Sequence, residues 1–494
     1  MKTILAIDEG TTGTTAVLMD ETLNLIAEAS VDFEQHFPKP GWVEHDPNQI
    51  WDAVKKTILD LSKKADLKTV AAIGITNQRE TICFWDKKTS KPLSNAIVWQ
   101  DRRTADICAQ LKKKNLEKKF QKQTGLLLDP YFSGTKIAWA IKNWPAVKTA
   151  FKNKTLAVGT IDSFLVAKLT SGESHVTEPS NASRTLCFHI SKHIWDKSLC
   201  KDLGVPLEIL PKVLPSTSVF GKTKGLDFLP DGIPITGILG DQQSALLGQA
   251  CIQEGQAKCT YGTGAFLLMN TGKKPKFSKH KLLTTVAWAL NDKDYTYALE
   301  GSTFIAGAAV QWFRDGLGLI EKSSDIEELA KKVPDSDGVT FVPALTGLGA
   351  PYWNPHATGL FTGITRGTNK SHFARSVLDG IAFQITDLLS AMQNDLGKPL
   401  KGLNVDGGAS LNNLMMQFQS DMLGVTLKRP KYIETTSLGA IFAAGLGAGI
   451  WKSLKQIEQT WKLGQTFQPS MKPSKRKKEL ARWKSAIKKA QLKS

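Results

Sequence analysis

The chain has 494 residues, enough for two or more domains, and its 41% hydrophobic and 22% charged residues are typical of a globular protein. No stretch approaches the roughly 20 apolar residues of a membrane span, the six cysteines lack metal-ligand spacing, and no aromatic-rich basic motif accompanies the net charge of +18. We therefore expect a cytoplasmic protein with reduced thiols, no membrane insertion and no nucleic-acid partner.

The N-terminal part begins with three short predicted strands, at residues 3–7, 15–19 and 24–30. Asp46-Pro47 then predicts a helix start, with an acidic N-cap and proline at the first helical position, and helical periodicity continues to about residue 64. A further strand is predicted at 69–76. A meander followed by alternating helices and strands indicates an α/β fold with mixed strand directions.

A similar pattern returns in the second half. Residues 257–272 (AKCTYGTGAFLLMNTG) predict a strand, a Gly-Thr-Gly turn and a second strand, and residues 295–299 predict another. Residues 403–424 predict a strand, a glycine pair and a helix that opens with Ser410. Two such units indicate a duplicated architecture with a cleft between the halves.

This pattern divides the chain into three predicted parts: residues 1–250, residues 251–457 and a basic tail at 458–494. In the tail, Leu480, Trp483 and Ile487 have helical spacing, so one face of a solvated helix is expected to pack on the protein. The glycines of the apolar run 439–451 do not directly follow a strand, which predicts close helix packing rather than a dinucleotide site.

The opening turn, IDEGTTGTTA at residues 7–16, has the composition of a phosphate site. Backbone amides of a Gly-Thr turn and the hydroxyls of Thr11 and Thr12 can donate to phosphate, and Asp8 can hold Mg²⁺ through oxygen. The alternative is a plain hairpin turn. The second Gly-Thr-Gly, at Thr263, repeats this chemistry in the other half.

Two further segments carry candidate acceptor chemistry. Asp241, in GDQQ, follows an apolar run and could take the proton of an attacking hydroxyl, although aspartate there is equally a helix N-cap. Arg79 and Glu80, after a predicted buried strand, offer the donors and acceptors that polyol hydroxyls need, and the competing interpretation is a surface ion pair. Trp99 and Phe266 could cover the carbon backbone of a polyol.

Together these motifs resemble the FGGY carbohydrate kinase family, and within it the members that phosphorylate glycerol. The resemblance runs from residue 3 to about residue 455. Its carriers are DEGTT, FPKPGWVEHDP, GITNQRET, VWQDRR, YFSGTKIAW, GDQQSALLGQ, YGTGAF, FVPALTGLGAPYW, GLFTGITRGTNKSHFARSVLDGIAFQ and VDGGASLNN.

The resemblance implies two RNase H-like domains of the actin, sugar kinase and Hsp70 superfamily, closing on a cleft. It also implies Mg²⁺-dependent transfer of the ATP γ-phosphate to glycerol, with sn-glycerol 3-phosphate and ADP as products, in a homodimer or homotetramer. Asp8 is expected to position Mg²⁺ and Asp241 to act as the base. The expected glycerol site is Arg79, Glu80, Trp99, Tyr131, Asp241, Gln242 and Phe266, and the expected nucleotide site is Thr11, Thr12, Gly13, Thr263, Gly307, Gln311, Gly408 and Asn412.

Three other functions are compatible with parts of this pattern. The acceptor could be a pentulose or erythritol, against which the Arg79–Glu80 pair argues. Water could replace the polyol in a phosphatase or NTPase, but Trp99 and Phe266 would then have no use. A non-catalytic binding protein would not need the two carboxylates Asp8 and Asp241.

The chain departs from the family pattern at two positions of the opening turn. Members commonly carry glutamine where Glu9 stands and arginine where Thr15 stands. Glu9 adds negative charge near the polyphosphate unless it faces away, and Thr15 removes a cation. We therefore expect weaker nucleotide binding than in members with that arginine.

Replacing Thr15 with arginine tests this expectation. A charge-assisted hydrogen bond to phosphate is worth about 1.5–3 kcal/mol, so Thr15→Arg should tighten ATP binding roughly tenfold or more in a titration of the purified protein. An unchanged ATP affinity would show that the missing arginine does not weaken this site.

Overall fold

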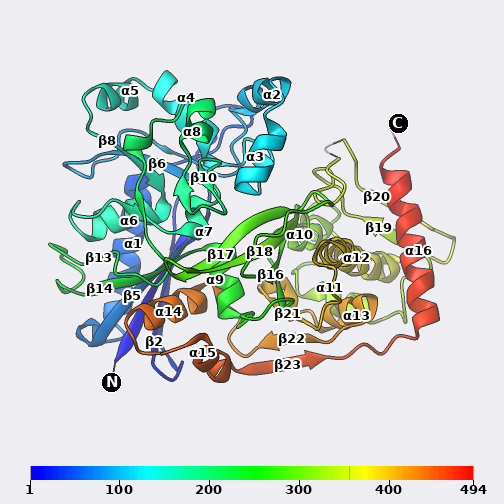
Figure 1. Cartoon of the computed structure of the whole chain (residues 1–494). Helices are drawn as coiled ribbons and strands as arrows, with labels where there is room; N and C mark the ends of the chain where they lie inside the picture. The colour runs from blue at the N-terminus through cyan, green and yellow to red at the C-terminus, as the bar shows by residue number, and fades with distance from the viewer. Residues whose placement is uncertain (1, 355, 493–494) are drawn as a thin grey trace.

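The computed structural model describes residues 2–354 and 356–492 and contains two large mixed sheets (Figure 1). In the N-terminal half the strand order is β13-β14-β5-β1-β2-β3, and in the C-terminal half it is β17-β18-β16-β15-β21-β22-β23. The N-terminal strands are β1 (Thr3–Glu9), β2 (Gly13–Asp20), β3 (Leu25–Asp32), β5 (Val70–Asn77), β13 (Gly221–Lys222) and β14 (Pro234–Gly240). The C-terminal strands are β15 (Ala257–Tyr261), β16 (Ala265–Gly272), β17 (Leu283–Asn291), β18 (Asp294–Thr303), β21 (Leu403–Asp406), β22 (Leu427–Pro430) and β23 (Leu463–Phe467).

The two sheets share one topology, which confirms the predicted duplication. In the N-terminal half, β1, β2 and β3 form an antiparallel meander, and β5 and then β14 add in parallel beside β1. In the C-terminal half, β15, β16 and β18 form the meander, and β21 and β22 add in parallel beside β15. The strand β17, which the sequence analysis missed, pairs with β18 at the sheet edge.

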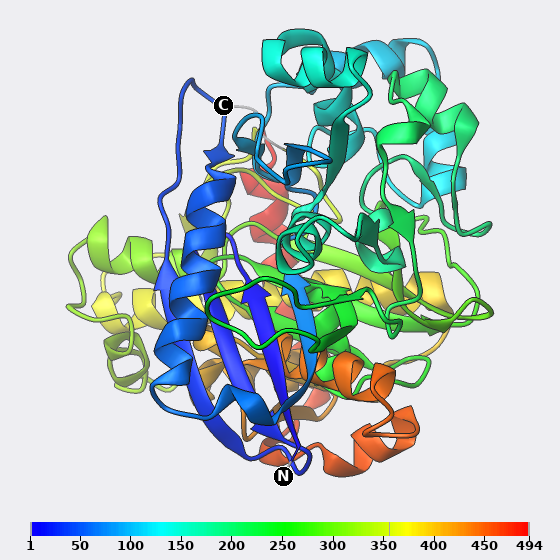
Figure 2. The same cartoon turned by 90° about the vertical axis from the view of Figure 1, so that its left-hand side faces the viewer.

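Successive side chains of β1 are buried in two different cores, one on each face of the sheet. Leu5 and Ile7 pack with helix α1 (Pro47–Ser62), which lies on the face seen in Figure 2. Ile4 and Ala6 pack with helix α14 (Thr435–Gly447) on the opposite face. Helix α1 begins as predicted, because the side chain of Asp46 accepts from Asn48 N and proline occupies the first turn.

Helix α14 comes from the C-terminal half of the chain but packs on the N-terminal sheet. Glycines on both sides of the contact allow this close approach. A side chain at Gly439 of α14 would collide with the carbonyl oxygen of Ser244 in helix α9 (Asp241–Gly248), and one at Gly74 of β5 would collide with Ala440 of α14. The core around α9 and α14 also takes in Leu268 and Trp288 of the C-terminal sheet. The close packing predicted for the glycine-rich run is confirmed, and the two halves share a core.

A third layer lies above the N-terminal sheet in Figure 1. It combines the four-stranded sheet β4-β7-β6-β8 with several helices around a separate apolar core. Its elements are β4 (Glu44–His45), β6 (Ile82–Asp86), β7 (Ala96–Ile97), β8 (Leu156–Thr160), α2 (Ala105–Lys113), α3 (Glu117–Thr124), α4 (Ser133–Asn143), α5 (Pro145–Lys152) and α8 (Lys197–Leu203). Helix α6 (Ile161–Leu169) connects this layer to the sheet below.

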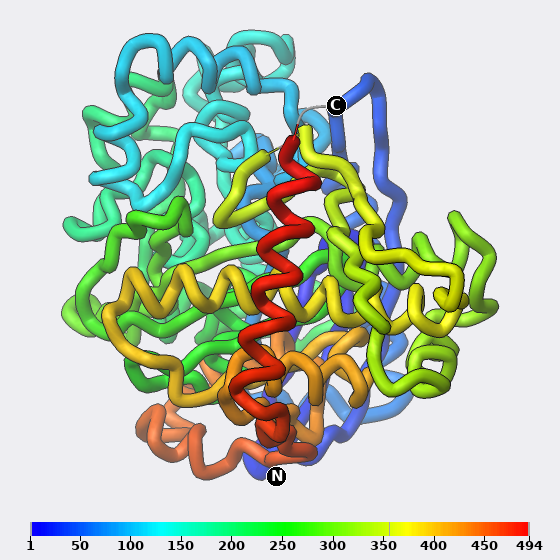
Figure 3. Tube along the Cα trace, turned by 90° about the vertical axis from the view of Figure 1, so that its right-hand side faces the viewer, coloured from blue at the N-terminus to red at the C-terminus, as the bar shows by residue number. Residues whose placement is uncertain are grey.

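The C-terminal sheet is covered by α10 (Gly307–Asp315), α12 (Lys370–Leu396) and α13 (Asn413–Leu423). Helix α16 (Pro473–Ala490) crosses the outside of this half along its whole length (Figure 3). Trp483 and Ile487 are buried and Leu480 packs beside them, as predicted for the helical face. Residues 493–494 of the predicted tail lie outside the described residues, and the three-part division of the chain stays a prediction.

The six cysteines are all free and buried. Within residues 2–354 and 356–492, no helix is both long and apolar enough to cross a membrane.

Candidate active site

The two Gly-Thr turns lie at equivalent places in the two sheets. Between β1 and β2, Gly10 N donates to Gly13 O at 2.9 Å, and between β15 and β16, Gly262 N donates to Gly264 O at 2.9 Å. Thr12 and Thr263 are exposed at the tips of these turns, while Thr11 is partly exposed. Both turns therefore leave hydroxyls free to meet a ligand.

The second turn is joined to the start of helix α10. Gly307 N donates to Gly262 O at 2.9 Å, and Ala306 N donates to Thr263 O at 2.8 Å. A Cβ on Gly307 would lie 2.7 Å from Gly262 O, so this approach requires glycine. The structure thus places the predicted nucleotide residue Gly307 against the turn that carries Thr263, with Gln311 exposed one helical turn later.

The third predicted turn follows β21 and lies against the end of β15. Gly407 has φ +82°, and a Cβ there would come within 2.6 Å of Tyr261 O. Gly408 is exposed and begins a short 3₁₀ turn, Gly408–Leu411, so the following helix does not open with Ser410 as predicted. Asn412 is its N-cap instead, and its Oδ1 accepts from Met415 N at 2.9 Å.

Asp8, at the end of β1, faces the N-terminus of α14. The hydroxyl of Ser437 donates to Asp8 Oδ2 at 3.1 Å. Burial raises the pKa of Asp8 to about 7; the Ser437 hydrogen bond opposes this shift, and the charges of Asp241 and Glu434 add to it. Asp8 and Asp241 therefore come close enough to repel, and within residues 2–354 and 356–492 no Lys, Arg or His forms an ion pair with Asp8.

This arrangement fits a divalent cation. Among the described residues, no group of three or more His, Cys, Asp or Glu side chains forms an all-protein metal centre. Mg²⁺ is usually held by one or two carboxylates together with phosphate oxygens and water. Asp8 meets that requirement, because it lies beside the first Gly-Thr turn and forms no ion pair among the described residues.

Glu9 points to the other face of the sheet, as neighbouring strand residues do. It is fully buried, and its carboxyl accepts from Gln78 Nε2 at 3.2 Å. Burial raises its pKa well above the usual range, with the Gln78 hydrogen bond acting in the opposite direction. The same Gln78 amide donates to Gly10 O at 2.9 Å, so Glu9 supports the turn from behind instead of lining it.

Asp241 is the first residue of α9. Gly240 occupies the N-cap position, so the N-cap alternative for Asp241 is wrong. Arg79 Nε lies 3.0 Å from Asp241 Oδ1, and Gln242 Nε2 lies 3.3 Å from Asp241 Oδ2. A Cβ on Gly240 would come within 2.7 Å of the Arg79 stem, so glycine at this position lets the arginine reach Asp241.

Arg79 and Glu80 are 3% and 1% exposed, so a surface ion pair is ruled out. They belong to a buried ion cluster with Arg184 and Glu300, two residues that the sequence analysis missed. Arg79 Nη1 donates to Glu300 Oε2 at 2.5 Å, Arg184 Nη2 donates to Glu300 Oε1 at 3.0 Å, and Arg184 Nε donates to Glu80 Oε1 at 2.5 Å. Glu300 lies on β18, so the cluster joins the two halves.

The electrostatics of the cluster differ between its two acids. Burial acts to raise the pKa of Glu300, but the charges of Arg184 and Arg79 outweigh it and lower the pKa to about 2. For Glu80 burial prevails, and the pKa is raised despite Arg184 and Arg79. Glu80 also has φ +61°, a backbone conformation that is uncommon outside glycine and that concentrates at functional sites.

The predicted aromatic residues lie next to the first turn. Trp99 Nε1 donates to Thr11 Oγ1 at 3.0 Å, and the Trp99 and Tyr131 rings meet edge to face with centroids 5.7 Å apart. Phe266 is partly exposed on β16, opposite Thr260. The Trp99 contact physically joins a predicted acceptor residue to a predicted phosphate residue.

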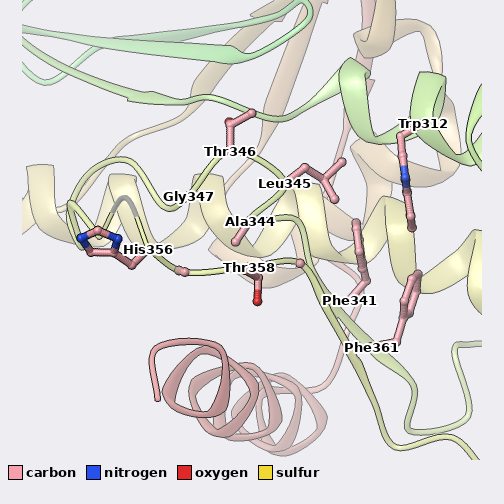
Figure 4. A pocket seen from close by; sticks show the side chains of 11 residues that line it. Trp312, Phe341, Ala344, Leu345, Thr346, Gly347, His356, Thr358 and Phe361 are labelled. Carbon is pink, nitrogen blue, oxygen red and sulfur yellow. The ribbon is translucent and has the colours of Figure 1, made fainter. Parts of the chain in front are cut away.

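A separate cavity of about 480 Å³ lies on the C-terminal half (Figure 4). Trp312, Phe341 and Phe361 form one side, and His356 lies at the opposite end. Of the described residues that line it, none belongs to the predicted acceptor or nucleotide sets. The cavity is therefore distinct from the candidate site.

Comparison with known proteins identifies the family of the chain. Residues 3–248 match the model for the N-terminal domain of the FGGY family of carbohydrate kinases, and residues 257–448 match the model for its C-terminal domain. The chain belongs to the FGGY family of carbohydrate kinases. Residues 249–256 separate the two matched regions, and the predicted division between residues 250 and 251 falls within this gap.

Individual FGGY proteins are similar over nearly the full length. Glycerol kinase of Bdellovibrio bacteriovorus is 55% identical over 486 residues, 98% of each chain. The crystal structure of Plasmodium falciparum glycerol kinase with ADP has a TM-score of 0.94 at 38% identity and covers 100% of this chain and 99% of its own. A xylulose kinase from Lactobacillus acidophilus has a TM-score of 0.88 at 25% identity, covering 99% and 97%.

The buried ion cluster leads to a prediction about pH. Because the pKa of Glu300 is about 2 in the folded chain and ordinarily 4.5, its stabilising contribution is complete above about pH 4.5 and is lost as pH falls towards 2. Glu300→Gln removes the carboxylate to which both buried arginines donate hydrogen bonds and should lower the free energy of unfolding by about 3–5 kcal/mol at pH 7.

Denaturant unfolding of the wild type and of Glu300→Gln, from pH 7 down to pH 3, measures the difference in their free energies of unfolding. This difference should shrink below pH 4.5. Glu173→Gln, which breaks an exposed pair with Lys224, is the control and should cost about 1 kcal/mol or less. A Glu300→Gln effect no larger than the control, or one that does not change with pH, would contradict the stabilising role of the cluster.

Proposed function

We propose that this chain is a glycerol kinase, which transfers the γ-phosphate of ATP to a terminal hydroxyl of glycerol and releases sn-glycerol 3-phosphate and ADP. The observation that carries the proposal is the placement of Asp241, with Arg79 3.0 Å away at the first turn of α9. The similarity to proteins named glycerol kinase, at 50–55% identity over 98–99% of the chain, supports the same substrate.

The acceptor is held by side chains with both hydrogen-bond donors and acceptors. Arg79 and Gln242 supply donors, Glu80 and Asp241 supply acceptors, and Trp99 and Tyr131 cover the carbon backbone, with Phe266 on the side of the other half. The Arg79–Glu300 and Arg184–Glu80 contacts fix the donors and acceptors in place before the acceptor arrives. Such preorganisation lowers the entropy cost of orienting the reacting hydroxyl.

In the reaction, Asp241 accepts the proton of the attacking glycerol hydroxyl while that oxygen bonds to the γ-phosphorus and the bond to the ADP oxygen breaks. The amides and hydroxyls of Thr11, Thr12, Gly13 and Thr263 bind the polyphosphate, and Gly307, Gln311, Gly408 and Asn412 face the nucleoside. Asp8 would hold Mg²⁺, which supplies positive charge to the phosphate oxygens. We further infer that the protein acts in the cytoplasm as a homodimer or homotetramer.

The test measures ADP release from MgATP in the presence of glycerol, dihydroxyacetone, erythritol or xylulose, and with no acceptor. We expect strong dependence on glycerol, and Asp241→Asn should lower kcat by about 10²–10⁴-fold because general-base catalysis is lost. The matched control is Asp292→Asn, an exposed aspartate in the turn before β18, which should leave turnover unchanged.

Turnover that is equal with every acceptor and with none would indicate an NTPase. Preference for xylulose or erythritol would indicate that the chain is a carbohydrate kinase with a different acceptor. Either result would overturn the proposal.

A further inference from the structure

Lys258 is a buried lysine that the proposed mechanism does not use. It lies on β15 and is 0% exposed. Among the ion pairs of the described residues, none involves Lys258. Burial lowers its pKa, while the charges of Asp406 and Asp241 act in the opposite direction. Burying an ammonium without a carboxylate partner is costly, so packing alone does not explain this residue.

The ammonium of Lys258 makes two hydrogen bonds, and both go to neutral oxygens. Nζ donates to Gln242 Oε1 at 2.6 Å and to Thr260 Oγ1 at 2.8 Å. An ammonium can only donate. The side-chain amide of Gln242 must therefore present its oxygen to Lys258 and its NH₂ group in the other direction.

That other direction is the candidate acceptor site. Gln242 Nε2 lies 3.3 Å from Asp241 Oδ2, on the carboxylate proposed as the base. One N–H of the amide can reach Asp241, which leaves the second available to a ligand oxygen. Lys258 comes from the C-terminal half and Gln242 from the N-terminal half, so one half orients a donor of the other.

We propose that Lys258 is a positioning residue for the phosphoryl acceptor, because it holds the Gln242 carbonyl oxygen and so directs the Gln242 N–H groups to Asp241 and to an acceptor hydroxyl. This inference rests on the proposed function. It predicts that Lys258 affects acceptor binding through Gln242 and has little effect on the nucleotide.

The test variant is Lys258→Met, which has a similar length and no hydrogen-bond donor. We expect KM for glycerol to rise about tenfold, kcat to fall less, and KM for ATP to stay within twofold of the wild type. In a Gln242→Leu background, adding Lys258→Met should change KM for glycerol less than twofold, because the amide it orients is gone. Lys398→Met, an exposed lysine paired with Glu254, is the control and should change neither constant.

An unchanged KM for glycerol in Lys258→Met would overturn the inference, as would an equal effect in the Gln242→Leu background. Should Lys258→Met fail to fold in a thermal melt, Lys258→Gln, which keeps a neutral donor, provides the same comparison and should raise KM for glycerol by a smaller factor. A wild-type protein that does not use glycerol would refute the proposed function itself, and this outcome is distinct from the others.

Discussion

The arrangement of the candidate active site depends on a buried cluster of four charges, Arg79, Glu80, Arg184 and Glu300. Buried ions are costly unless each has a partner, so the cluster is stable only when both halves of the chain contribute. Glu300 from β18 is the part supplied by the C-terminal half. The side chains of the N-terminal half that are proposed to bind the acceptor are therefore held in place by the C-terminal half.

Close packing of helices produces a second link between the halves. Glycines at the contacts of α14 with β5 and α9 let the helix axis approach the N-terminal sheet, and its first turn then reaches Asp8 through Ser437. A helix N-terminus favours nearby negative charge, which partly offsets the cost of burying this carboxyl. The same packing that forms the shared core thus places the residue proposed to hold Mg²⁺.

Much of the fold could be predicted because its signals are local. The two meanders, the Asp46-Pro47 helix start and the Gly-Thr turns each depend on residues close together in the sequence. The helix after β21 was placed too early because both Ser410 and Asn412 are good N-cap residues, and only the 3₁₀ turn between them decides which one is used. The cluster could not be predicted in the same way, since Arg79 and Glu300 are 221 positions apart and Glu300 lies within an otherwise ordinary buried strand.

The most direct test of this account is glycerol binding measured by calorimetry, without nucleotide, for the wild type and for Glu300→Gln at pH 7. Glu300 is not proposed to touch glycerol, and it acts only by holding Arg79 and Arg184. The account predicts that Glu300→Gln weakens glycerol binding at least tenfold while the protein remains folded. Unchanged affinity in a folded variant would show that the cluster does not determine the geometry of the acceptor site.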